Sequence, residues 1–216
     1  MDKYKKFSIL LLFVFWNCFE YEETIYFKKG FSGFVEIAYT VPIKERSKTS
    51  LIKFLPVTEE DVNSRINKGL FAKNIKVRDF SVKFLEKDER EDVVYREKAR
   101  VFYRLDFNEL SQLDGILLGS LFVQKKGNSI SIKREFKSVS MSPPNPTPGE
   151  KKIFTESMRL LKDGYVHFRV IFPIAAECRS NKGEISLGLL SYKFPLTDTV
   201  EKIGNNLWNY SITTAY

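Results

Sequence analysis

Residues of the types that carry out catalysis or take a covalent modification are few in this chain. It contains one histidine, His167, and two widely separated cysteines, Cys18 and Cys178. A structural zinc site needs about four nitrogen or sulfur ligands, which these residues do not supply. The Gly-x-Ser-x-Gly turn that presents the nucleophile of many serine hydrolases is also absent from the sequence. We therefore expect no metal, no cofactor and no catalytic residue.

Adjacent carboxylates could support acid–base hydrolysis only where they face a cleft. Such pairs occur at Glu22–Glu23 and Glu59–Glu60. We expect the first pair on a solvated strand surface and the second in the first turn of a helix, where it complements the helix dipole. His167 is expected on a sheet surface, and Cys178 as a half-buried free thiol at a strand end.

Cys18 is the residue whose position indicates a covalent modification. Three lysines near the amino terminus precede an apolar run at residues 7–16, which is the layout of a secretory signal. The run is shorter than the roughly 20 residues that a helix needs to cross a bilayer. A cysteine directly after the run fits a lipoprotein signal, in which the thiol receives diacylglycerol and becomes the first mature residue. We predict a signal peptide at residues 1–17 and lipidation of Cys18; an ordinary cleaved signal and an uncleaved membrane anchor are the alternatives.

The segment Phe15-Trp16-Asn17-Cys18 resembles a lipobox. The common lipobox has Leu three residues before the cysteine and a small residue directly before it, whereas this chain has Phe15 and Asn17 there. The permissive lipoboxes of spirochaetal lipoproteins are similar to this segment. The resemblance implies a lipid-anchored protein of the bacterial cell membrane, inner or outer, facing the periplasm or the cell surface.

The charge of the chain is moderately basic. The formal net charge is +8, and loss of residues 1–17 removes three lysines and one aspartate, leaving +6. The basic residues are spread along the chain and alternate with acidic stretches such as 86–92. This pattern favours a solvated surface and argues against a nucleic-acid partner, with attraction to anionic lipid head groups as the alternative. If Cys18 is acylated, no intramolecular disulfide can form, so packing must stabilise the fold.

The pattern of apolar residues predicts an α+β domain over residues 18–216: a twisted antiparallel sheet of hairpins with one or two helices packed on one face. Helices are expected at 58–70 and 152–162, and a single helical turn at 108–113 capped by Asn108. A bulge is expected near Asp79. The proline-rich stretch 142–149 cannot join a sheet and is expected to form an exposed loop. Strands are expected at 24–27, 33–39, 75–84, 93–107, 116–124, 129–139, 165–172 and 184–194.

The order of these pieces resembles the LppM-like family of bacterial envelope lipoproteins. The resemblance is carried by the strand pair at 21–39, the helix at 58–70, the strand and leucine-containing turn at 101–113, and the closing hairpin at 168–196. This chain departs from the family in Lys182, inserted between Asn181 and Gly183, and in Tyr192, where the family usually has Trp. The resemblance implies links to envelope lipids and cell-surface interactions, and it supplies no catalytic residue.

Taken together, these features predict a noncatalytic membrane lipoprotein of the cell envelope. Its expected partners are the membrane, through the N-terminal lipid, and an envelope lipid, glycan or protein bound at the free face of the sheet. The alternative is a surface-displayed adhesion module that uses the loop at 142–149. An envelope hydrolase is the least favoured function.

Overall fold

The computed structural model describes residues 19–52, 55–67, 75–87, 89, 96–136, 148, 155, 164–198 and 207–214. Its helical segments are α1 (Glu59–Asn67) and the two 3-10 turns η1 (Lys29–Phe31) and η3 (Leu110–Leu113). Its strands are β1 (Glu20–Phe27), β2 (Gly33–Pro42), β3 (Val77–Phe84), β4 (Lys98–Phe107), β5 (Ser120–Lys126), β6 (Ser129–Glu135), β7 (Tyr165–Ile171), β8 (Ala176–Ser180), β9 (Glu184–Ser186), β10 (Leu189–Pro195) and β11 (Leu207–Thr214).

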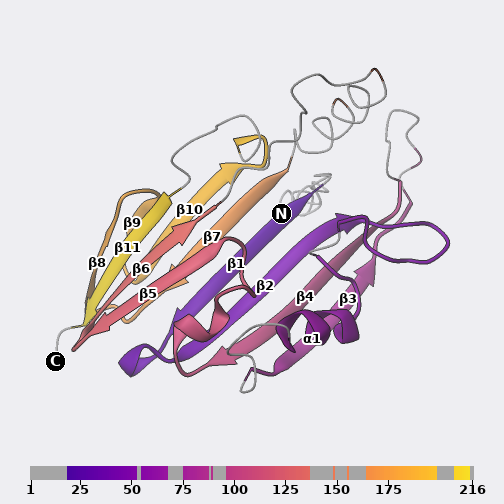
Figure 1. Ribbon diagram of the computed structural model, residues 1–216. Coiled ribbons are helices and arrows are strands. Elements are labelled where there is room, and N and C mark those ends of the chain that lie inside the picture. Colours follow the sequence, from indigo (N-terminus) through magenta and orange to yellow (C-terminus); the bar gives the residue numbers. More distant parts are fainter. Residues whose placement is uncertain are drawn as a thin grey trace, which may run out of the picture.

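The strands form two sheets that lie face to face (Figure 1). The large sheet has seven strands in the order β3-β4-β2-β1-β7-β10-β9, and the small sheet has four in the order β5-β6-β11-β8. Helix α1 lies on the face of the large sheet that the small sheet also covers, and it lies beside the small sheet (Figure 1). The fold class is α+β, as expected.

The hairpins that join neighbouring strands follow the sequence pattern closely. The antiparallel pairs β1–β2, β3–β4 and β5–β6 all occur where they were expected. The register of β3 on β4 shifts between Arg78 and Ser81, and Asp79 has a φ of 53°, so the expected bulge is confirmed. The expected helix at 58–70 is confirmed as α1, whose first turn is capped by the Thr58 hydroxyl accepting from the Asp61 N–H at 3.2 Å.

Several expectations about the sheets and turns are wrong. There are two sheets and not one, and β8 and β11 were not expected as strands. Strand β1 pairs with β7 in parallel, because the chain crosses to the small sheet and back before it enters β7 at the end where β1 begins. The turn η3 is capped by Glu109 and not by Asn108. Apart from Pro148 and Thr155, the expected helix at 152–162 and loop at 142–149 lie outside the described residues.

Aromatic side chains fill the space between the sheets. Trp208 of β11 is fully buried and stacks on Phe168 of β7, with ring centroids 5.4 Å apart. Phe136 stacks on the same phenylalanine at 5.2 Å. Under α1 the core continues with Val62 and Ile66, which are both buried. The interior is therefore packed by side chains from both sheets and the helix.

Candidate binding groove

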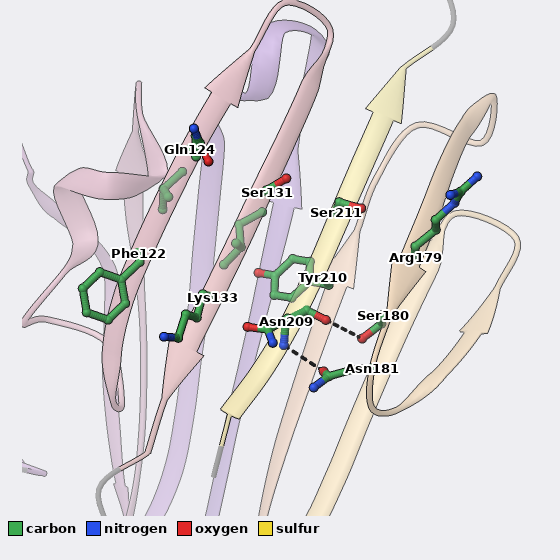
Figure 2. A pocket seen from close by; sticks show the side chains of 12 residues that line it. Phe122, Gln124, Ser131, Lys133, Arg179, Ser180, Asn181, Asn209, Tyr210 and Ser211 are labelled. Carbon is green, nitrogen blue, oxygen red and sulfur yellow. Dashed lines mark hydrogen bonds between the residues drawn. The ribbon is translucent and has the colours of Figure 1, made fainter. Parts of the chain in front are cut away.

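The outer face of the small sheet forms a shallow, open groove of about 630 Å³ (Figure 2). All four strands of that sheet contribute to it. Strand pairing aligns the outward side chains in two parallel rows. One row contains Phe122, Lys133, Asn209 and Asn181, and the other contains Gln124, Ser131, Ser211 and Arg179.

Alternation along each strand places these side chains. In β11, Trp208, Tyr210 and Ile212 are buried against the large sheet, so Asn209 and Ser211 between them face outward. Strand β6 shows the same period of two, with Ser131 and Lys133 exposed between buried neighbours. The groove is therefore the polar face of strands whose other face is core.

The end of the groove at β8 is held by hydrogen bonds between the two asparagines of its row. The Asn209 N–H donates to Asn181 Oδ1 at 2.8 Å, and the Asn181 N–H donates to the Asn209 carbonyl at 3.0 Å. The Ser180 hydroxyl lies 3.3 Å from the same carbonyl oxygen (Figure 2). This arrangement orders the backbone on which the adjacent polar side chains stand.

An aromatic ring and two cations border the groove. The side chain of Phe122 is 55% exposed, and Lys133 Nζ lies 5.6 Å from the centroid of its ring. At the far edge, Arg179 is ion-paired with Glu177, with nitrogen and oxygen 2.8 Å apart. A partner would thus meet an apolar ring at one edge and a guanidinium at the other (Figure 2).

Several polar groups between these edges are free to bind a ligand. Within the described part of the chain, the side chains of Gln124, Ser131 and Ser211 make no hydrogen bond to protein. Amides and hydroxyls both donate and accept, so this set matches the hydroxyl groups of a sugar, while Phe122 offers a surface for its apolar C–H face. The described residues that line the groove include no Asp, Glu, His or Cys, which are the usual groups for acid–base or nucleophilic chemistry.

A buried ion pair joins the floor of the groove to the large sheet. Arg134 of β6 and Glu23 of β1 are almost completely buried and form a bidentate pair with nitrogen–oxygen distances of 2.5 and 3.2 Å. The Tyr21 hydroxyl donates to the second carboxylate oxygen at 3.1 Å, and Arg134 also donates to the Leu118 carbonyl. Burial and the adjacent carboxylate raise the pKa of Tyr21 well above its ordinary value, so it remains a donor. The expectation that Glu23 is solvated is wrong.

The other residues considered from the sequence lie away from the groove. His167 is on the outer face of the large sheet, as expected, with Nε2 2.9 Å from Ser191 Oγ. Burial lowers its pKa, and the nearby Arg169 adds to this effect. Cys178 is a half-buried free thiol, also as expected, and burial raises its pKa to about 11. Glu59 and Glu60 are exposed in the first turn of α1, and Cys18 lies outside the described residues.

Sequence reasoning missed this groove and placed the binding face on the free side of a single sheet. The signal that could have located it is the alternation from Trp208 to Thr213, which is as regular as that of β7. Elsewhere in the described ranges, no group of three or more His, Cys, Asp or Glu residues could hold a metal ion. No helix there combines the length and apolar character needed to cross a bilayer.

Comparison with known proteins places the chain in a family. Residues 13–216 match a protein family described as LIC11874-like. The chain belongs to the LIC11874-like family. The match includes Cys18 and all of the described residues. No curated protein matches this LIC11874-like chain in sequence.

Two solved structures are similar to this member of the LIC11874-like family. The folded domain of LppM from Mycobacterium tuberculosis is 16% identical, with a TM-score of 0.49 over 93% of this chain and 92% of that one. An M1 zinc metallopeptidase from Deinococcus radiodurans is 13% identical, with a TM-score of 0.27 over 90% of this chain and 41% of that one. Both TM-scores are below 0.5, and neither similarity is high enough to transfer a function.

Proposed function

We propose that this chain is a noncatalytic lipoprotein of the bacterial envelope, held at the cell membrane by a lipid on Cys18, and that its groove binds a glycan. The observation that carries the binding role is the outer face of the small sheet, where neutral amides and hydroxyls stand in rows beside an exposed aromatic ring. Sugars need many hydrogen-bonding partners of both kinds and an apolar surface for stacking, and this face provides them.

A glycan fits this surface better than an acyl chain does. An acyl chain needs a continuous apolar cavity, whereas the space between the sheets is filled by side chains such as Trp208 and Phe168. Lys133 adds positive charge at the groove, which favours a glycan that carries acidic groups. A surface-displayed adhesion module would use the same anchor, with the proline-rich segment at 142–149 as its contact.

Substitution of the exposed aromatic ring tests the glycan-binding role. The full chain would be assayed on an array of bacterial envelope oligosaccharides, and we expect Phe122→Ala to weaken binding about fivefold to tenfold because the stacking surface is lost. Phe84→Ala is the matched control, since Phe84 is also an exposed aromatic, 50% accessible, but lies on β3 of the large sheet. Wild-type chains that bind no glycan, or equal effects of the two substitutions, would contradict the proposal.

A further inference from the structure

Several turns lie together at the end of the molecule opposite the start of β1. Strands β1, β7 and β10 are in register at this end, where Tyr26 aligns with Ile171 and Ile171 with Leu189. The β5–β6 turn reaches the same end, because Lys125 Nζ donates to the Gly30 carbonyl of the β1–β2 turn at 2.9 Å. Figure 1 shows these turns at the opposite end of the sheets from the N-terminal side of β1.

Two large aliphatic side chains protrude from this end. Leu187 in the β9–β10 turn is 79% exposed, and Ile174 after β7 is 70% exposed. They belong to neighbouring turns, since the Phe172 N–H donates to the Gly188 carbonyl at 3.0 Å. Gly188 has a φ of +70°, which allows the tight turn that raises Leu187. Isolated exposed apolar residues are common, but two protruding aliphatics on adjacent turns form a patch.

Lysines flank this patch on the next two turns. Lys28 and Lys29 follow β1, which pairs with β7, and Lys125 and Lys126 end β5. All four side chains are exposed. Two acidic side chains toward this end are already paired, Glu177 with Arg179 at 2.8 Å and Asp106 with arginines of β3 and β4. The end is therefore both apolar and positively charged. We name it the distal tip, made up of Lys28, Lys29, Lys125, Lys126, Ile174 and Leu187.

We propose that the distal tip docks onto an anionic lipid bilayer, with Ile174 and Leu187 inserted at the head-group boundary and the lysines on the anionic head groups. Apolar side chains beside lysines bind such surfaces through two additive terms, burial of apolar area and attraction to the surface potential. The lysines are the reason for choosing a bilayer, because they place positive charge beside the apolar patch, where it complements anionic head groups.

The position of the tip relative to Cys18 determines which bilayer the tip would contact. Phe19, directly after Cys18, is buried and its carbonyl accepts a hydrogen bond from the Tyr165 N–H, so the fold begins next to the proposed anchor. A chain held by Cys18 would direct the tip away from its own membrane and toward a second one. This orientation depends on the anchor in the proposed function, whereas the affinity of the tip for anionic lipid does not.

Vesicle capture by the full chain tests the proposal. The chain is reconstituted on the outside of neutral phosphatidylcholine vesicles, and capture of a second, dye-labelled population containing phosphatidylglycerol is measured. We expect capture that weakens with salt. Ile174→Ser with Leu187→Ser should reduce it at least about tenfold, and Lys28→Ala with Lys29→Ala about thirtyfold.

Matched control variants are available at other places on the surface. Val82→Ser with Phe84→Ser removes exposed apolar side chains of β3, and Lys44→Ala with Arg46→Ala removes exposed cations at the opposite end of β2. Both controls should capture vesicles as the wild type does. Circular dichroism of each variant establishes that it is folded.

The possible results distinguish lipid binding by the tip from attachment through the anchor and from binding of a second copy of the chain. Absence of capture by the wild type, or equal capture by tip and control variants, would overturn the proposal. Clustering of the protein-bearing neutral vesicles among themselves would overturn it in favour of a second copy as the occupant. A chain that does not float with the neutral vesicles has no working anchor, and its co-flotation with phosphatidylglycerol vesicles then tests the tip directly by the same criteria.

Discussion

At the scale of single residues, the carboxylate of Glu23 is the least expected feature of the interior. It lies in the middle of an apolar row, between Ile37 of β2 and Phe168 of β7. The guanidinium of Arg134 reaches it from the small sheet and also lies 4.4 Å from the ring centroid of Phe168. Since both charges are removed from water, each depends on the other for compensation.

Removal of the cation from this pair should therefore be costly. We expect Arg134→Met to lower the free energy of unfolding by about 3–5 kcal/mol, because Glu23 is left buried without its partner. The double variant Glu23→Leu with Arg134→Met should recover most of that loss, since neither charge is then buried. Urea denaturation followed by circular dichroism measures both values. Arg179→Met, which removes an exposed arginine, is the control, and a similar small loss in both single variants would refute this account.

At the scale of elements, the turn between β8 and β9 carries the chain from the small sheet back to the large one. It is ordered by the Ser180 hydroxyl, which donates to the Lys182 carbonyl at 2.7 Å and accepts from the Trp208 indole N–H at 3.1 Å. Gly183 then turns the backbone with a φ of +88°. Lys182 thus lies inside a well-bonded turn.

Gly183 lies in this turn at a position with no room for a side chain. A Cβ there would lie 2.5 Å from the Ser191 carbonyl oxygen. We expect Gly183→Ala to destabilise the fold by about 2 kcal/mol or more, from the left-handed backbone and the clash together. Gly127→Ala is the control, because its φ is +58° but its surroundings are open, and it should cost about 1 kcal/mol. Equal unfolding midpoints for the two variants would show that the close contact in the turn has no energetic consequence.

At the scale of the whole molecule, the described fold begins one residue after Cys18. A lipid on that cysteine would hold the domain directly at the membrane without a flexible tether, because Phe19 already belongs to the core. Such an arrangement limits the rotation of the domain. It also leaves the outer face of the small sheet, which carries the groove, on the side of the molecule. The β1–β2 and β5–β6 turns lie at the far end (Figure 1).

The anchor itself is tested by the intact mass of the protein extracted from its native membrane. We expect a chain that begins at Cys18 and carries added acyl mass, because a thiol directly after the apolar run is the acceptor of lipoprotein signals. The variant Cys18→Ala should lack that mass. A chain cleaved elsewhere without modification would make this a secreted domain, and an uncut chain would restore the alternative of a membrane anchor.

Much of the local structure follows from the sequence alone. Aromatic and β-branched residues bounded by Gly and Lys predicted the second half of β1 and most of β2, and alternation of apolar residues predicted β7. Thr58 with the acidic residues after it predicted the start of α1. The bulge at Asp79 was also predicted, because the apolar period breaks there. These features depend on neighbours in the chain, so a window of a few residues contains their causes. The lipidation of Cys18, which likewise depends on local sequence, stays a prediction.

Tertiary structure alone decided which faces are covered. Alternation shows that Glu22 and Glu23 point to opposite sides of β1, but only the arrival of Arg134 from a distant strand makes the second a core residue. The groove depends in the same way on strands far apart in the sequence, since β11 pairs with both β6 and β8. Long-range pairing is selected by the total burial of the folded chain, and no single segment contains that information.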